Sequence, residues 1–236
     1  MPEKKKIDIV IPAHNEDQNL NFLLPKIIKI IKSNKFYKFR LILIDDKSTD
    51  NTSFIINKYL KKNNFVKLII NKKKSGQTFC YQKYLTNFKS DYFIRIDGDN
   101  QDNPKYLKKI LKFIKSDFDL IMGRRTIRKH SVYMILLTYL YDYLIFFLIK
   151  KKLKTYSSSL VCFKRDFLSK KNLKFNDHRY FPLISINNGA SKIKIFDTIH
   201  QKRKFGTSKY KQINKVFNAL PEFLLFFYRL KRGDFN

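Results

Sequence analysis

The stretch Tyr92-Phe93-Ile94-Arg95-Ile96-Asp97-Gly98-Asp99 is the part of the chain that says most about its fold and its site. Residues 92–96 are mostly apolar, which is typical of a strand buried on both faces of a sheet. Two carboxylates, on Asp97 and Asp99, follow directly after this run. A strand that ends in Asp-x-Asp presents two hard oxygen ligands in one place. Such ligands suit a divalent cation and the phosphates that it carries.

Strands and helices alternate on both sides of that stretch. Short apolar or alternating runs predict further strands at residues 7–11, 41–44, 66–70, 120–122, 159–163 and 192–195. Apolar spacing and helix-start signals predict helices at residues 19–33, 52–60, from about 77, 104–115 and 179–188. This alternation predicts an α/β fold whose mainly parallel sheet carries helices on both faces, with the segment 192–195 as an edge strand.

Acidic residues follow three of these predicted strands. They are Glu16, the pair Asp45–Asp46, and Asp97 with Asp99. Ligands of open parallel sheets bind beyond the carboxyl ends of the strands. We therefore expect these acids to meet in one crevice.

The second half of the chain has two further apolar segments. Residues 131–149 contain no Lys or Arg, but Asp142 interrupts them, so we expect a buried or membrane-interface helix rather than a membrane-spanning one. Residues 213–230 repeat apolar positions at helical spacing. We expect a catalytic domain at residues 1–212, with the apolar helix at 131–150 inside it, followed by an amphipathic helix at 213–236.

The composition is strongly basic, with 50 Lys and Arg against 19 Asp and Glu and a formal net charge of +31. This favours an anionic partner, such as an anionic membrane surface or substrate, although a coding sequence rich in A and T would give a similar bias. Nucleic-acid binding is a remote alternative, because no recognition motif is visible and an acidic crevice repels phosphate unless a metal intervenes. Cys80 and Cys162 form no CxxC pair, which favours a reducing compartment.

Six segments resemble, in order, the motifs of family 2 glycosyltransferases with the GT-A fold. They are residues 11–16, 44–50, 97–102, 122–125, 178–182 and 203–210. The last two are similar to the branch of dolichol-phosphate mannose synthases and bacterial polyprenyl-phosphate glycosyltransferases. The resemblance covers about residues 7–212. It implies a GT-A (Rossmann-like) sheet and an inverting, metal-dependent transfer of a sugar from a nucleoside-diphosphate sugar to a polyprenyl phosphate.

The resemblance also assigns roles at the donor site. It implies binding of the nucleotide sugar by Pro12, His14, Glu16, Ile44, Asp46, Asp97, Gly98, Asp99, Arg125, Arg203 and Lys209. His14 stands where the family usually has tyrosine. It implies that Mg2+ or Mn2+ is held by Asp97, Asp99 and Gln101, where the metal stabilises the leaving diphosphate. The implied catalytic residues are Asp99, Arg125, Arg203 and Lys209, since arginine binds phosphate bidentately and lysine as a point charge.

Some of these acids also have a structural interpretation. Asp45 and Asp46 are suited to a helix-capping turn. Asp102 precedes Pro104 and is expected to cap the helix that begins there.

Two acceptors remain open. A polyprenyl phosphate is already an anionic nucleophile and needs positioning more than a base. Its candidate contacts are Arg128, Ser131, His178 and Arg179, although residues 131–138 lack the arginine usual in that branch. A saccharide hydroxyl would need a base, for which Asp177 is the candidate. We expect a cytoplasmic enzyme, peripheral on the cytoplasmic face of the membrane; the base, the sugar and the oligomeric state are not identified.

Overall fold

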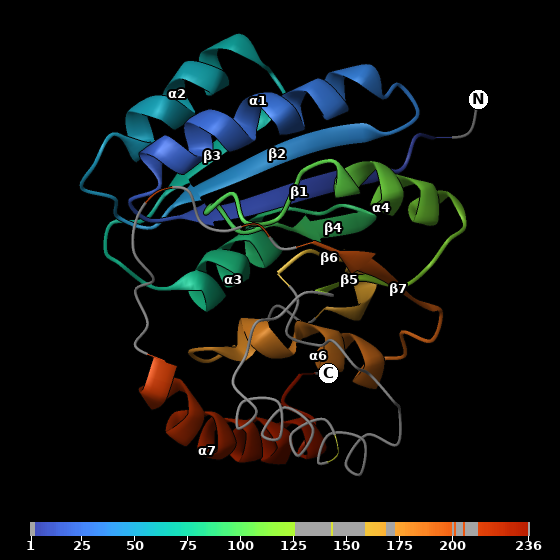
Figure 1. Cartoon of the computed structure of the whole chain (residues 1–236). Coiled ribbons are helices and arrows are strands. Elements are labelled where there is room, and N and C mark those ends of the chain that lie inside the picture. Colours follow the sequence, from blue (N-terminus) through green and yellow to red (C-terminus); the bar gives the residue numbers. More distant parts are fainter. Residues whose placement is uncertain are drawn as a thin grey trace.

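The computed structural model describes residues 3–125, 143, 159–168, 173–199, 201, 205 and 212–235 (Figure 1). In the last segment, side chains are described from residue 221 onward. Several sequence predictions lie outside these residues: the apolar helix at 131–150 and the site candidates Arg128, Ser131, Arg203 and Lys209.

The described strands form one seven-stranded sheet in the order β3-β2-β1-β4-β6-β5-β7. β6 is antiparallel to both β4 and β5, and all other neighbours are parallel, which confirms the mainly parallel sheet. The predicted edge strand near residue 192 is confirmed as β7. The strands are β1 (Lys6–Ala13), β2 (Lys38–Asp45), β3 (Val66–Ile70), β4 (Tyr92–Arg95), β5 (Leu120–Arg125), β6 (Val161–Lys164) and β7 (Ile193–Thr198).

The helices agree with most of the predicted ones. They are α1 (Asp17–Ser33), α2 (Thr52–Lys62), α3 (Gln77–Asn87), α4 (Tyr106–Lys115), α6 (Phe181–Asn187) and α7 (Gln212–Lys231). Two 3-10 turns, η1 (Arg165–Phe167) and η2 (Asp177–Tyr180), accompany them. The single helix predicted at 179–188 is wrong in its bounds. The segment is divided between η2 and α6, where Pro182 occupies the first turn of α6, a position that suits proline.

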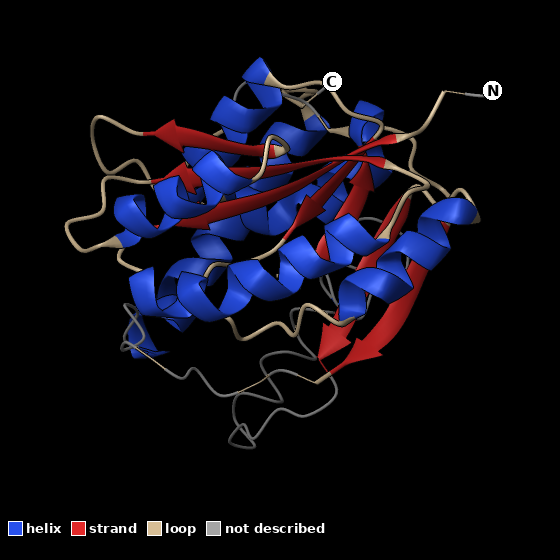
Figure 2. Cartoon of the chain, turned by 90° about the horizontal axis from the view of Figure 1, so that it is seen from above, coloured by secondary structure: helices blue, strands red, loops and turns tan. Residues whose placement is uncertain are grey.

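The two faces of the sheet carry separate apolar cores, with helices on both sides (Figures 1 and 2). Successive side chains of a strand point to opposite faces. Ile7, Ile9 and Ile11 of β1 therefore pack with α1, α2 and α4, whereas Val10 packs with α3, α6 and α7. Full burial of each such side chain stabilises the fold by about 1.5–3 kcal/mol. The sheet is therefore held from both sides, and its strand ends are fixed.

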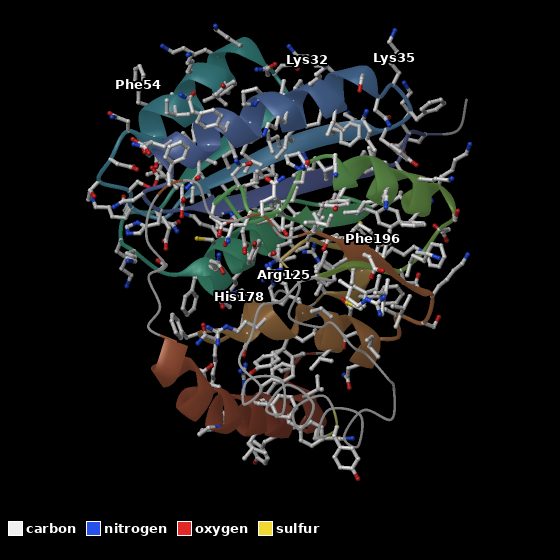
Figure 3. All side chains as sticks on the ribbon, viewed as in Figure 1. Lys32, Lys35, Phe54, Arg125, His178 and Phe196 are labelled. Atoms are coloured by element: carbon white, nitrogen blue, oxygen red, sulfur yellow. The ribbon has the colours of Figure 1, made fainter. Side chains whose placement is uncertain are left out.

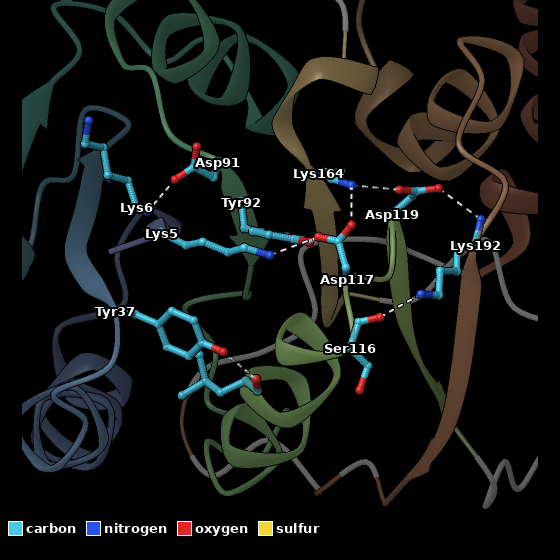
Figure 4. A network of polar contacts seen from close by, with 11 residues as sticks. Lys5, Lys6, Tyr37, Asp91, Tyr92, Ser116, Asp117, Asp119, Lys164 and Lys192 are labelled. Carbon is cyan, nitrogen blue, oxygen red and sulfur yellow. Dashed lines mark hydrogen bonds and ion pairs between the residues drawn. The ribbon is translucent and has the colours of Figure 1, made fainter. Parts of the chain in front are cut away.

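The two edges of the sheet differ in charge. At the amino ends of the parallel strands, Asp117 pairs with Lys5 and Lys164 at 2.9 and 3.0 Å and accepts a hydrogen bond from the Tyr92 hydroxyl (Figure 4). The hydrogen bond from Lys5 is the largest of the causes that hold the pKa of Asp117 well below its usual range. The acids of this edge are thus matched by lysines. The acids that were predicted to meet, Asp45–Asp46 and Asp97 with Asp99, lie at the ends of the strands at the opposite, carboxyl edge.

None of the described helices combines the length and the apolar character that crossing a membrane requires.

Candidate active site

The acidic turn, residues 97–102, follows β4. Its position depends on the close approach of Gly98 to the end of β1. Gly98 packs against the end of β1: a Cβ atom at this position would lie 3.2 Å from the carbonyl oxygen of Pro12 and 3.5 Å from Cγ2 of Ile11. A larger residue would therefore push the two strand ends apart. The missing side chain lets the half-buried carboxylates of Asp97 and Asp99 lie at the carboxyl edge, beside β1.

Asp97 lies among charges of both signs. Burial is the main cause that raises its pKa to about 6, and the neighbouring charges of Asp99 and Asp102 act in the same direction. Arg95 and Arg125 oppose them. The acidic cluster is therefore compensated only in part by protein cations, and a further cation would stabilise it.

Arg95 belongs to this site, although the sequence analysis treated it as part of an apolar run. It is 6% exposed, lies over the ring of Tyr81 and donates through Nη1 to the carbonyl oxygen of His178 at 2.7 Å. A single cation inside an apolar strand, directly before two acids, was the signal that could have found it. A buried cation needs partners of opposite charge, and the charge of Arg95 acts on the nearby carboxylate of Asp97.

The residues of the turn fit a hard divalent cation. Asp97 and Asp99 offer carboxylates, and the Gln101 amide donates its nitrogen to the carbonyl oxygen of Gln201 at 3.3 Å, which leaves its amide oxygen as the remaining donor atom. Oδ1 of Asn100, on the same turn, is buried and has no hydrogen-bond partner in the part of the chain that the structure describes. Oxygen donors of this kind suit Mg2+ or Mn2+. No three His, Cys, Asp or Glu side chains converge on one metal-sized site within the described ranges, so such a cation would need further oxygens from water or phosphate.

Arg125 is held at the end of β5 by a buried hydroxyl. Its Nη2 donates to Oγ of Ser159 at 2.5 Å, and Ser159 in turn donates to the carboxylate of Asp102. Among the described residues, the buried Nε of Arg125 has no hydrogen-bond partner. Arg125 therefore places its charge beside the acidic turn, where it acts on Asp97.

The expectation that Asp102 caps the helix after Pro104 is wrong. α4 has no side-chain cap, and the Asp102 carboxylate accepts from Ser159 instead. The two residues are 57 positions apart and meet because β6 runs antiparallel between β4 and β5. A local reading of the sequence cannot detect a partner that only the strand order supplies.

The ends of β1 and β2 form the other wall of the site. Pro12 and Ile44 are register partners, which aligns the residues that follow each strand. The ring nitrogen Nδ1 of His14 lies 2.9 Å from the backbone carbonyl oxygen of Asp46. The two strands thus bring these donor-site candidates into direct contact.

Asp46 is buried and binds its own chain. Its Oδ1 accepts from Nδ2 of Asn71 at 2.9 Å and from the amide of Ser75 at 2.8 Å, and its Oδ2 accepts from the amide of Gly76 at 2.7 Å. Asp46 therefore orders the loop that leads into α3. This loop borders the same edge of the sheet, so Asp46 shapes the wall of the crevice.

Two neighbouring acids have local partners. Asp45 accepts from the amide of Ser48 at 2.8 Å and from the hydroxyl of Ser53, so it organises the turn before α2. The expectation that Asp45 and Asp46 cap a helix is wrong, because the N-cap residue of α2 is Asn51 and no side chain caps this helix. Oε2 of Glu16 accepts from Nδ2 of Asn19 at 2.7 Å, at the start of α1.

The chain after β7 returns to the site at two described residues. The amide of Gln201 donates to the carbonyl oxygen of Gln101 at 2.9 Å, next to the acidic turn. Phe205 stacks on Phe22 of α1, with ring centroids 5.5 Å apart. The two residues flank the predicted phosphate-binding position Arg203 in the sequence.

The predicted acceptor residues Asp177, His178 and Arg179 form η2, behind Arg95. Asp177 is 3% exposed, and both of its carboxylate oxygens accept from Nη1 of Arg229, at 3.1 and 2.9 Å. Burial lowers the pKa of His178 well below its usual value; its Nδ1 lies 2.8 Å from the Thr78 hydroxyl oxygen. Figure 3 labels His178 and Arg125 among the side chains of the central region. Asp177 and His178 are therefore buried side chains that support Arg95, whereas Arg179 is half-exposed and pairs with Glu222.

Solved structures with the same architecture define the class of protein. Glucosyl-3-phosphoglycerate synthase from Mycobacterium tuberculosis, in complex with Mn2+, uridine diphosphate and glucosyl-3-phosphoglycerate, matches with a TM-score of 0.71 at 14% identity, over 94% of this chain and 80% of that one. Mannosyl-3-phosphoglycerate synthase from Rubrobacter xylanophilus matches with a TM-score of 0.70 at 13% identity, over 97% and 75%. The fold is that of GT-A glycosyltransferases.

The sequence narrows this class to one family. The model of glycosyl transferase family 2 matches residues 8–179, so the chain belongs to this family of enzymes. A dodecaprenyl-phosphate galacturonate synthase from Rhizobium johnstonii is 27% identical over 96% of this chain and 68% of its own length. An undecaprenyl-phosphate 4-deoxy-4-formamido-L-arabinose transferase from Photorhabdus laumondii is 26% identical over 92% and 67%.

Proposed function

We propose that this enzyme transfers a sugar from a nucleoside-diphosphate sugar to a polyprenyl phosphate, with inversion at the anomeric carbon and with the help of Mg2+ or Mn2+. The observation that carries the proposal is the turn of Asp97 and Asp99 beside Arg125 at the carboxyl edge of the sheet. The names of the relatives from Rhizobium johnstonii and Photorhabdus laumondii, both of which state a polyprenyl phosphate, support the acceptor.

Different residues of the site would bind different parts of the nucleotide-sugar donor. Asp97, Asp99 and the Gln101 amide would hold the metal, which supplies Lewis-acid stabilisation of the leaving nucleoside diphosphate when bound. Arg125, whose guanidinium is held beside the acidic turn by Ser159, is suited to bind a phosphate oxygen. The nucleoside end of the donor would lie against His14 and Asp46. These residues are in contact, because the ring nitrogen Nδ1 of His14 lies 2.9 Å from the backbone oxygen of Asp46.

The state of Asp177 favours a phosphate acceptor over a saccharide hydroxyl. A hydroxyl needs a base within reach, but Asp177 is 3% exposed and binds Arg229 through both oxygens. A polyprenyl phosphate arrives already ionised and needs cations and alignment. The basic chain, with its net charge of +31, is suited to supply them.

The outer face of α7 supports a peripheral place on the cytoplasmic face of the membrane. Leu224 and Leu225 are each 54% exposed and Tyr228 is 62% exposed, one helical turn further on. Lys231 and Arg232 follow three and four residues after Tyr228. An apolar stripe next to cations is the pattern of a helix that lies in the interface of an anionic bilayer.

The test of the reaction is a panel of nucleotide sugars with a short polyprenyl phosphate, in the presence of Mn2+. Asp99→Asn should lower transfer by more than about 100-fold, since even the loss of a residue that supports a metal ligand costs 10- to 100-fold. The matched control is Asp117→Asn, at the opposite edge of the sheet (Figure 4), which should keep its activity. Wild-type activity of Asp99→Asn would refute the proposed site.

The test of membrane attachment is sedimentation with anionic liposomes at low salt. The double variant Leu224→Ser/Leu225→Ser should stay in the supernatant while the wild type sediments. Phe54→Ser is the control, because Phe54 is also apolar and 69% exposed but lies on α2, on the far side of the sheet (Figures 1 and 3). Equal sedimentation of all three proteins would exclude α7 as the attachment surface.

A further inference from the structure

The inner face of α7 packs on η2 through aromatic rings. Tyr180 stacks on Phe226 with ring centroids 4.3 Å apart and meets Phe223 at 5.9 Å. Contacts of this kind bury apolar area but fix direction poorly, because a helix can shift along an apolar surface at little cost. The position of α7 therefore needs a more directional restraint.

Ion pairs between α7 and η2 supply that restraint. Nη1 of Arg229 donates to both oxygens of Asp177, and each of these residues is 3% exposed. Glu222 accepts from Asn176 at 2.9 Å and from Arg179 at 3.3 Å. We call these five residues the α7 latch. Any other register would separate the buried carboxylate of Asp177 from the guanidinium of Arg229, and the separation of a buried ion pair is strongly destabilising.

The segment held by the latch is linked to the acidic turn through Arg95 of β4 and through the start of α3. The carbonyl oxygen of His178 accepts from Arg95 at 2.7 Å, and the Thr78 hydroxyl oxygen lies 2.8 Å from Nδ1 of His178. Gln77, next to Thr78, donates its amide to Oδ1 of Asp97 at 3.5 Å. A displacement of η2 would therefore move the His178 carbonyl oxygen that accepts from Arg95. It would also move Thr78, the neighbour of Gln77, whose amide donates to Asp97.

We propose that Asp177, Arg229 and Glu222 are positioning residues of the transferase: they set α7 against η2, and through Arg95 they hold the acidic turn in its working geometry. The proposal rests on the proposed function for the role of Asp97 and Asp99. It gives Asp177 a structural task in place of that of a base, and it extends the functional unit to a helix beyond the part matched by the family model, residues 8–179.

A rescue experiment separates positioning from base catalysis. Arg229→Gln leaves the buried charge of Asp177 without its cation, and Asp177→Asn removes the carboxylate that accepts twice from Nη1 of Arg229. The kcat of the folded protein should therefore fall by about 10-fold or more in each variant. The double variant Asp177→Asn/Arg229→Gln removes both charges and keeps a neutral hydrogen-bonding pair, so its kcat should return to within about 3-fold of the wild type. Lys5→Gln is the control, because Lys5 belongs to an exposed ion pair with Asp117 at the opposite edge of the sheet.

The outcomes decide between the two tasks. If the double variant is as inactive as Asp177→Asn, Asp177 acts as a base and the positioning proposal is wrong. If the single variants have wild-type kcat once the folded fraction is counted, the latch serves stability alone and the proposal is also wrong. Because Glu222 is partly exposed, Glu222→Gln gives a milder variant should the singles fail to fold, and it should show a smaller loss of kcat.

A second measurement needs no substrate. Amide hydrogen exchange should become faster at residues 95–101 and 176–179 in Arg229→Gln and return toward the wild-type rate in the double variant, while β1 and β2 stay protected. Unchanged exchange at residues 95–101 would overturn the link to the acidic turn. A failure of the proposed function is distinguishable, because it would leave Asp99→Asn fully active whatever the latch variants do.

Discussion

The burial of His178 predicts a defined dependence of stability on pH. His178 is 6% exposed, and its pKa is lowered mainly by burial and also by the charges of Arg95 and Arg179. In the unfolded chain a histidine titrates near 6.5, so below that pH the unfolded state binds a proton that the folded state does not. Between the two pKa values the free energy of unfolding should therefore fall with decreasing pH, by about 1.4 kcal/mol per pH unit.

The sign is opposite for Asp97, whose raised pKa of about 6 lets the folded state gain a proton first as the pH falls. The total pH dependence consequently mixes both groups, and only a comparison with a variant isolates His178. Urea unfolding of the wild type and His178→Gln at about pH 7.5 and 5.5 gives four free energies, and the wild type should lose about 1.4 kcal/mol more than the variant between these conditions.

The control is Phe54→Ser, which replaces an exposed side chain that does not titrate, on α2, and should keep the pH dependence of the wild type. Parallel behaviour of the wild type and His178→Gln would refute the reasoning, because it would mean that His178 is protonated in the folded state as readily as in the unfolded one.

Three further outcomes are expected. Gly98→Ala should lower the free energy of unfolding by about 1–3 kcal/mol in urea melts, because its Cβ would lie 3.2 Å from the carbonyl oxygen of Pro12; an unchanged midpoint would contradict this. Arg40→Met should cost about 3–5 kcal/mol, since it leaves the 0% exposed carboxylate of Asp8 without its bidentate partner. The exposed pair of Arg124 and Asp197 offers the control, for which Arg124→Met should cost at most about 1 kcal/mol. Dialysis against a chelator should abolish transfer and added Mn2+ should restore it; retained activity after chelation would exclude the metal from the mechanism.

The order of strands and helices could be predicted because each depends on local pattern. The apolar run before Asp97 and the helical spacing of α1 follow from which side chains must leave water. The same patterns placed the acids Glu16, Asp46 and Asp97 at strand ends, and parallel pairing then required these ends to share one edge. The partners of individual side chains could not be predicted in this way. Asp102 was expected at a helix start but binds Ser159, and Asp177, a candidate base, lies buried against Arg229.

The sequence by itself determined the family and the acidic turn, since six ordered motifs and the Asp97-Gly98-Asp99 spacing are local facts. The tertiary structure alone decided which charges are compensated. β6 brings Ser159 between Asp102 and Arg125, η2 places a carbonyl oxygen on Arg95, and α7 supplies Arg229 from 52 residues away. A buried charge persists only with a partner, and the packing of distant elements, which no local pattern records, determines what that partner is.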